Sequence, residues 1–307
     1  MRIAFINALA ELAKHDSRIL LLTSDLGYMV IEPFAEQYPD RFINVGVAEQ
    51  NMVGVATGLA DAGFVPFIYS ITPFAVLRPF EFIRNGPVYH QLPVRIIGVG
   101  QGVEYGFNGN SHFGLEDVGV LRTQPGLTII APADDAQTKT AIEKTSNLTG
   151  PVYFRLSKDS FEIPELSGNF ELGQTQQIGN GMDVLILSTG AITREVIQAA
   201  QLLSDQGLRS TILVIASIAP APVSDLIKAL STFKCAFTVE SHYITGGIGS
   251  LVAEIVADHC LNVRVVRLGF DVLLNNPLGS SAYLQAANGL SPEKIASRIQ
   301  KVLEESN

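Results

Sequence analysis

The sequence is poor in cysteine, and its two cysteines, Cys235 and Cys260, stand apart from each other. Neither belongs to a Cys-x-x-Cys pair or has a histidine in ligand spacing, so the sequence favours packed, reduced thiols over a disulfide or a zinc site. It also lacks an apolar run of the roughly 18 residues that a membrane helix needs, and its N-terminus lacks the form of a signal peptide. We therefore expect a cytoplasmic protein with no membrane contact.

Basic residues are also few. Lys and Arg number 21 against 30 Asp and Glu, which gives a formal net charge of −9. An acidic surface repels nucleic acid and anionic lipid, so neither is an expected partner, although a local basic pocket could still bind a phosphate. The 307 residues are 47% hydrophobic and 17% charged, a balance typical of about two folded domains with a sizeable core.

Strand-like and helix-like segments alternate along the whole chain. This pattern predicts an α/β protein with two consecutive α/β domains, each with a mostly parallel sheet flanked by helices. We place the first domain at residues 1–160, a glycine-rich linker at 161–182 and the second domain at 183–307. Residues 100–116 form a glycine-rich loop that is too long for a simple connection, which points to a functional role.

One carboxylate, Glu49, is placed where a predicted strand ends and a helix begins. Ligands of open α/β sheets bind at such strand ends. On position alone, a simpler interpretation is that Glu49 caps its own helix or complements the helix dipole. The helix over residues 49–62 carries several small residues, which suggests close packing against another backbone. They are Gly54, Ala56, Gly58 and Ala60.

Several motifs, in order and in spacing, resemble the transketolase family over most of residues 1–160. They are Gly46-Val47-Ala48-Glu49-Gln50-Asn51-Met52, Phe74, Arg78-Pro79-Phe80-Glu81-Phe82-Ile83-Arg84-Asn85, Gly109-Asn110-Ser111-His112, Pro125-Gly126-Leu127 and Ala131-Pro132-Ala133-Asp134. The second domain continues the resemblance with Glu240-Ser241-His242 and Gly246-Gly247-Ile248-Gly249. The resemblance implies the C-terminal half of a split transketolase, a pyrimidine-binding domain followed by the family's C-terminal domain.

The resemblance assigns three residues to the cofactor thiamine diphosphate. Glu49 matches the catalytic glutamate that hydrogen-bonds the pyrimidine ring nitrogen and so helps the cofactor to lose its thiazolium proton. Phe74 matches an aromatic residue that stacks on the pyrimidine, although Ile71 and Leu77 stand where the family often has further aromatics. Asp25 matches an aspartate near the cofactor at the subunit boundary, and a turn or cap role fits it about equally well.

The resemblance also assigns substrate contacts. His112 matches a catalytic-pocket histidine, which suits proton transfer near neutral pH. Asn108 stands where the family usually has an aspartate that binds a substrate hydroxyl, and Gln101 lies where a histidine is expected. Arg155 matches an arginine that binds the substrate phosphate. These departures put the usual sugar preference in doubt.

The chain lacks the Gly-Asp-Gly motif with which this family holds Mg²⁺ and the diphosphate. Gly179-Asn180-Gly181 has no carboxylate, so we assign no metal ligand to this chain. The resemblance then implies a companion subunit of similar size that carries the motif, an α₂β₂ assembly, and helix 49–62 as a candidate contact surface.

The function that follows is transfer of a two-carbon ketol unit between sugars or sugar phosphates. Two alternatives remain open on the sequence. One is a deoxyxylulose-phosphate-synthase-like enzyme or the β chain of a 2-oxoacid dehydrogenase. The other is a non-catalytic paralogue.

Overall fold

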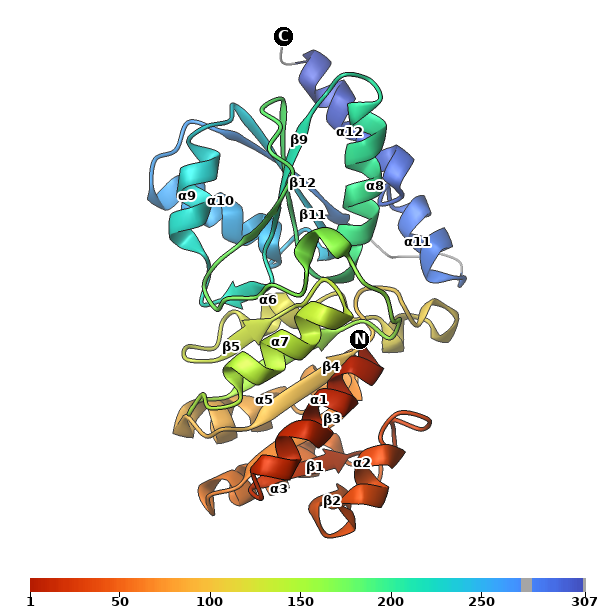
Figure 1. Ribbon diagram of the computed structural model, residues 1–307, viewed down its shortest axis with the longest axis vertical. Coiled ribbons are helices and arrows are strands. Elements are labelled where there is room, and N and C mark those ends of the chain that lie inside the picture. The colour runs from red at the N-terminus through yellow and green to blue at the C-terminus, as the bar shows by residue number, and fades with distance from the viewer. Residues whose placement is uncertain (272–277, 306–307) are drawn as a thin grey trace.

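Two sheets form the two lobes of the chain in a computed structural model, which describes residues 1–271 and 278–305 (Figure 1). The first sheet has the strand order β10-β5-β6-β4-β3-β1-β2, and all neighbouring strands are parallel except β10 and β5. Its strands are β1 (Ile19–Thr23), β2 (Phe42–Asn44), β3 (Val65–Ile71), β4 (Arg95–Val99), β5 (Thr128–Ile130), β6 (Val152–Leu156) and β10 (Ser217–Ala219). The central strands β1, β4 and β6 are buried throughout, as expected of parallel strands covered on both faces.

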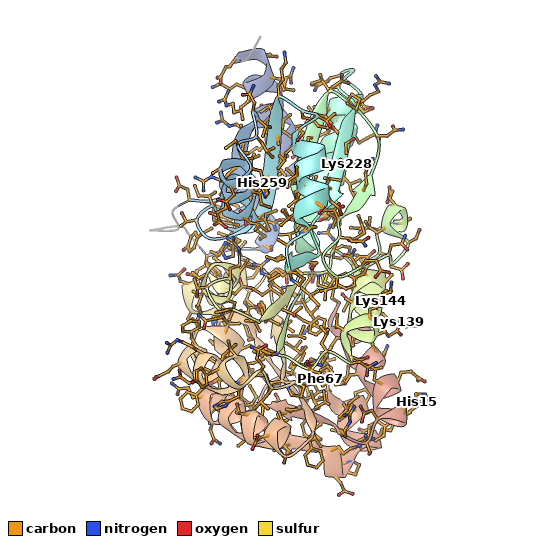
Figure 2. The ribbon with its side chains drawn as sticks, turned by 90° about the vertical axis from the view of Figure 1, so that its left-hand side faces the viewer. His15, Phe67, Lys139, Lys144, Lys228 and His259 are labelled. Atoms are coloured by element: carbon orange, nitrogen blue, oxygen red, sulfur yellow. The ribbon has the colours of Figure 1, made fainter. Side chains whose placement is uncertain are left out.

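Helices cover both faces of this first sheet. They are α1 (Arg2–His15), α2 (Glu32–Gln37), α3 (Glu49–Asp61), α4 (Thr72–Val76), α5 (Phe80–Ile83), α6 (Asp117–Leu121) and α7 (Asp135–Thr145). Alternate residues of β1 point to opposite faces: Leu21 joins the core under α1 and α7, whereas Leu20 and Leu22 join the core under α3 and α4. Figure 2 shows Phe67 inside this lobe, with His15 and Lys139 at its surface.

The second sheet has the order β12-β11-β8-β9-β7, in which only the edge strand β7 is antiparallel to its neighbour. Its strands are β7 (Gln176–Ile178), β8 (Val184–Ser188), β9 (Ser210–Val214), β11 (Cys235–Tyr243) and β12 (Arg264–Phe270). Its helices are α8 (Thr193–Ser204), α9 (Val223–Leu230), α10 (Ile248–Asp258), α11 (Ser281–Ala287) and α12 (Pro292–Glu305). Helices α8 and α12 pack together on one face and α9 and α10 on the other (Figure 1).

The predicted fold class, two mostly parallel α/β sheets flanked by helices, is confirmed. Two short strands, β10 and β7, were not revealed by the sequence. Strand β10 follows β9 in the chain yet pairs with β5 in the first sheet, and β7 arises from the glycine-rich segment 161–182. One apolar core cluster also runs from Ile68 in β3 to Leu187 in β8, so the lobes share buried contacts. The boundaries at residues 160 and 183 stay predictions.

The thiol interpretation needs one correction. Cys235 is half-buried, and burial raises the pKa of its thiol, but Cys260 is exposed rather than packed. Cys260 also has a left-handed backbone with φ of 51°, which places it in a turn after α10. In the described part of the chain, no helix combines the length and the apolar character needed to cross a membrane.

Candidate active site

Four neighbouring strands, β4, β3, β1 and β2, deliver the predicted site residues to one edge of the first sheet. Asp25 follows β1, Glu49 follows β2, Phe74 follows β3, and the loop with Gln101 and His112 follows β4. Because these parallel strands end at the same edge, residues that are far apart in the sequence meet there.

Glu49 is the first residue of α3, and its side chain is only 5% exposed. Its Oε1 accepts a hydrogen bond of 2.9 Å from Nη1 of Arg78. The residue before the helix, Ala48, provides no side-chain cap. The carboxylate is therefore directed to a partner outside its own helix, although its place in the first turn also suits the helix dipole.

The Phe74 ring contacts both a cation and an imidazole. The guanidinium carbon of Arg78 is 3.8 Å from the centroid of the Phe74 ring, and the His112 ring meets the same ring at 5.0 Å and 68°. Phe74 is 9% exposed, whereas the Arg78 side chain is 46% exposed. Glu49, Arg78, Phe74 and His112 thus form one continuous cluster.

The loop over residues 100–116 carries His112 to this cluster. Gly102 and Gly114 pair through two backbone hydrogen bonds of 2.9 and 2.8 Å, which close the base of the loop. The Oγ of Ser111 lies 3.0 Å from Nδ1 of His112. Asn108 is exposed in the short 3₁₀ turn at 106–108, beside the exposed Phe107.

Asp25 is an exposed residue with a left-handed backbone, φ 58°. Its backbone N–H donates to Oδ1 of Asn44 at 3.0 Å, and the Asn44 amide donates back to its carboxylate at 3.2 Å. The same Asn44 oxygen accepts from the N–H of Gly46. Asp25 therefore joins the ends of β1 and β2, directly before the turn that leads to Glu49.

Arg155 and Gln101, which the sequence predicts as substrate contacts, are both buried in the structure. The Arg155 guanidinium is fully buried; its Nε donates to Asp117 at 2.7 Å, and its Nη2 donates to the carbonyls of Gly114 and Ser241. Gln101 is also buried, donates to the Arg155 carbonyl and accepts from the backbone N–H of Ala191. Both residues join the lobes, because Ser241 and Ala191 belong to the second one.

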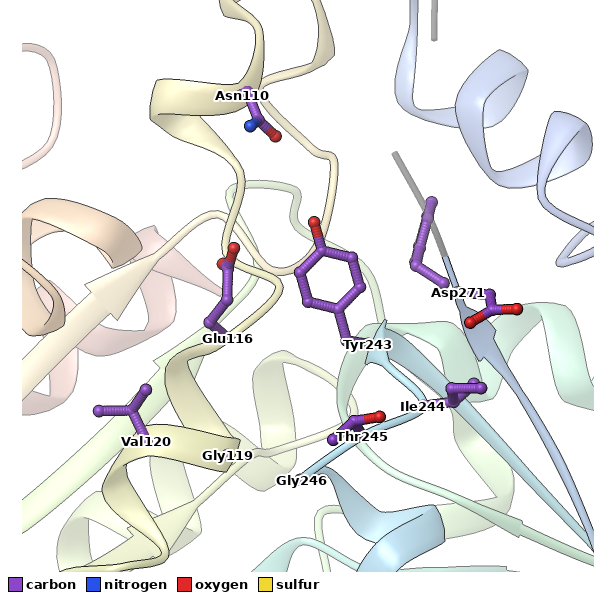
Figure 3. A pocket seen from close by; sticks show the side chains of 10 residues that line it. Asn110, Glu116, Gly119, Val120, Tyr243, Ile244, Thr245, Gly246 and Asp271 are labelled. Atoms are coloured by element: carbon purple, nitrogen blue, oxygen red, sulfur yellow. The ribbon is translucent and has the colours of Figure 1, made fainter. Parts of the chain in front are cut away.

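A cavity of about 530 Å³ lies between the lobes, beside the loop that carries His112 (Figure 3). In this view the Tyr243 ring stands between Glu116 and Asp271, and Asn110 from the His112 loop reaches the same space. Burial raises the pKa of both Glu116 and Tyr243. The residues that line this cavity do not include Glu49, Phe74 or His112.

The Glu49 cluster fits a flat nitrogen heterocycle. A nearly buried carboxylate can bind a ring N–H, and Phe74 offers an aromatic face beside it. Arg78, a flat group with N–H donors, already makes both of these contacts. Across residues 1–271 and 278–305 there is no cluster of three or more His, Cys, Asp or Glu that could hold a metal ion.

The sequence places Arg78 within the motif Arg78-Pro79-Phe80-Glu81-Phe82-Ile83-Arg84-Asn85 but does not indicate a role for it. Its spacing from Phe74, four residues, is the signal that could have found it, because side chains four apart in a helical turn share one face. The contact with Glu49 has no such local signal, because it joins residues on two separate elements.

The fold and the Glu49 edge define an α/β chain that carries a nearly buried carboxylate beside an aromatic ring at the carboxyl ends of its parallel strands. The family descriptions "Transketolase, pyrimidine binding domain" and "Transketolase, C-terminal domain" match residues 1–163 and 173–295. The chain belongs to the transketolase family, as the sequence motifs predicted.

The chain is similar to proteins that are themselves parts of transketolases. It is 36% identical to the putative transketolase C-terminal section of Methanocaldococcus jannaschii, over 98% of this chain and 95% of the relative. It is 33% identical to the 6-deoxy-6-sulfo-D-fructose transketolase subunit of Clostridium sp. strain MSTE9, over 100% and 95%. A solved structure described as a split gene transketolase, inactive beta4 tetramer, matches with a TM-score of 0.88 and 32% identity, over 99% of this chain and 98% of that one.

Proposed function

We propose that this chain is the pyrimidine-binding subunit of a two-component transketolase, which transfers a two-carbon ketol unit between sugars or sugar phosphates. The observation that carries the proposal is the nearly buried Glu49 carboxylate, directed at the open edge beside the Phe74 ring. Full-length similarity to transketolase subunits supports the same reaction class. When bound, thiamine diphosphate supplies the thiazolium carbon that takes up the two-carbon unit.

In this proposal, Glu49 holds a proton against the pyrimidine ring nitrogen, and Phe74 supports one face of the ring. Helix α3 fixes the carboxylate, since Glu49 begins the helix while Met52 and Val53 anchor it in the core. His112 contacts Phe74 and is therefore placed to exchange a proton with a substrate above the ring. Asp25 supports the turn that positions Glu49.

We assign the diphosphate and its Mg²⁺ to a companion subunit in an α₂β₂ assembly. Around the Glu49 edge, several large apolar side chains are exposed, as at a surface that another protein covers. They are Tyr28, Met29, Val47, Phe82 and Phe107. The α3 face with Gly54 and Gly58 is also exposed, and an added side-chain carbon at Gly58 would meet no atom within 4 Å. Another helix could approach closely here.

We expect the substrate site to differ from the one usual in the family. Arg155 is buried in an ion pair with Asp117, so a phosphate on the substrate needs another cation. The exposed amide of Asn108 presents both donors and an acceptor to a sugar, instead of a carboxylate. We therefore propose a sugar acceptor or donor outside the standard pentose phosphates.

The experiment is purification of the complex from the native host, followed by turnover assays with thiamine diphosphate, Mg²⁺ and a panel of ketoses. Glu49→Ala should lower kcat by at least about a hundredfold, the lower range for a positioned acid or base. Glu81→Ala, which removes an exposed carboxylate on α5, is the matched control and should leave kcat unchanged. Intact turnover by an assembled Glu49→Ala enzyme would refute the proposed role, and no turnover by the wild type would favour the non-catalytic alternative.

A further inference from the structure

Arg78 touches both groups that the proposed function assigns to the pyrimidine ring. Its Nη1 donates to Glu49 at 2.9 Å, and its guanidinium carbon stands 3.8 Å from the centroid of the Phe74 ring. Because Glu49 is 5% exposed, the ion pair reaches into the edge of the core instead of lying on the outer surface. One flat side chain thus spans the carboxylate and the aromatic face.

A guanidinium and a protonated aminopyrimidine have the same recognition properties. Each is planar and delocalised, each donates N–H groups in its own plane to a carboxylate, and each stacks on an aromatic ring. At 3.8 Å, the guanidinium fills the stacking distance above Phe74. A heterocycle cannot stack on this face while Arg78 remains there.

We propose that the Arg78 side chain occupies the pyrimidine site and keeps it closed when the chain is alone. The pyrimidine ring of the cofactor must displace this side chain in order to bind. The inference rests on the proposed function, since it takes Glu49 and Phe74 as the contacts of the ring. It adds a competing side chain that the same two residues bind in the absence of the cofactor.

The position of Arg78 allows this exchange. The side chain is 46% exposed and belongs to the short turn between α4 and α5, so its guanidinium can rotate into solvent without unfolding a helix. When Arg78 is in place, it neutralises the nearly buried Glu49 charge and covers Phe74. Without an occupant, the chain would leave a carboxylate unpaired in a largely apolar edge, which is unfavourable.

The test uses the full chain without its companion and thiamine as the probe, because thiamine has the pyrimidine ring and lacks the diphosphate. Calorimetry measures the Kd for the wild type, Arg78→Ala and Arg84→Ala. Arg84 is an exposed arginine six residues away whose side chain bonds Asn85, so its variant is a control for the lost charge. Arg78→Ala should bind thiamine about tenfold more tightly than the wild type. This factor corresponds to the combined free energy of a half-exposed ion pair and a cation–π contact, which the ring no longer has to replace. Arg84→Ala should match the wild type.

Thiamine affinity that is equal or weaker in Arg78→Ala overturns the inference, and so does the absence of measurable binding in every variant. The single variant Glu49→Ala, measured in the same calorimetric assay, separates this failure from a failure of the proposed function. If Glu49→Ala abolishes thiamine binding while Arg78→Ala leaves it unchanged, the ring still binds at Glu49 and only the role of Arg78 is wrong. If neither substitution changes the affinity, the ring does not bind at this edge and the proposed function fails too.

Discussion

Removing the charge of Asp117 should destabilise the whole chain, because this carboxylate neutralises a buried arginine. Arg155 and Asp117 are at most 1% exposed, and Oδ2 of Asp117 accepts from both the Arg155 Nε at 2.7 Å and the Tyr153 hydroxyl at 2.6 Å. Burial by itself lowers the pKa of Arg155, but the Asp117 carboxylate, together with Tyr153 and Glu104, outweighs this effect, so the pKa is raised. The arginine therefore stays charged and depends on its partner.

Asp117→Asn keeps the shape and the acceptor for Tyr153 but removes the carboxylate charge that the guanidinium contacts directly. Loss of one partner of a buried pair costs about 3–5 kcal/mol. That is a large part of the roughly 5–15 kcal/mol by which a typical folded domain is stable. Replacing both residues, as in Asp117→Asn/Arg155→Met, removes the charge together with its partner and should cost less than the sum of the single changes.

The assay is urea unfolding of the isolated chain for the two single variants and the double variant. We expect a coupling free energy of about 2 kcal/mol or more between the two positions, within the range seen for contacting residues. Glu254→Gln is the control, since it removes an exposed ion pair between Arg122 and Glu254 that also joins the lobes and should cost under about 1 kcal/mol. Additive effects, or a cost for Asp117→Asn no larger than that of the control, would refute the reasoning.

Three further outcomes follow from local geometry. Gly58→Ala should raise the unfolding free energy of the isolated chain by about 0.5–1 kcal/mol, because Gly58 is in mid-helix with open space around it; urea unfolding checks this. Gly106→Ala should lower it by about 1–3 kcal/mol in the same assay, because its side-chain carbon would lie 2.2 Å from the Gly279 carbonyl oxygen; an unchanged midpoint would contradict the close packing. Burial raises the pKa of Glu240 from 4.5 to about 7. Because the pKa of Glu240 is higher in the folded chain than in the unfolded chain, the protonated side chain stabilises the fold fully below pH 4.5. This stabilisation of roughly 3 kcal/mol is lost as the pH rises through about 7. The difference in stability between the wild type and Glu240→Gln should therefore change between pH 5 and 8, and a constant difference would contradict the raised pKa.

Sequence patterns predicted the fold class because they reflect local physics. Buried parallel strands read as apolar runs, as in Ile19-Leu20-Leu21-Leu22 of β1, and amphipathic segments between the strands read as helices. The sequence does not reveal β10, because three residues give too short a pattern and its pairing with β5 joins the two halves of the chain.

The candidate site was predictable only in part. The place of Glu49 between a strand and a helix is visible in the sequence, because strand ends of an α/β sheet gather at one edge. The function of Arg155 was not predictable from its place at the end of a strand-like run. Its burial depends on Asp117, 38 residues away in the chain, and on Ser241 from the other lobe.

The sequence by itself determined the α/β class, the transketolase motifs and the position of Glu49, because each depends on neighbouring residues or on their spacing. Only the tertiary structure decided which charges meet. It paired Glu49 with Arg78 and Asp117 with Arg155, since ion pairs and ring contacts form between elements that the sheet brings together. The chain's chemistry therefore depends on contacts across strands, which local sequence periodicity does not encode.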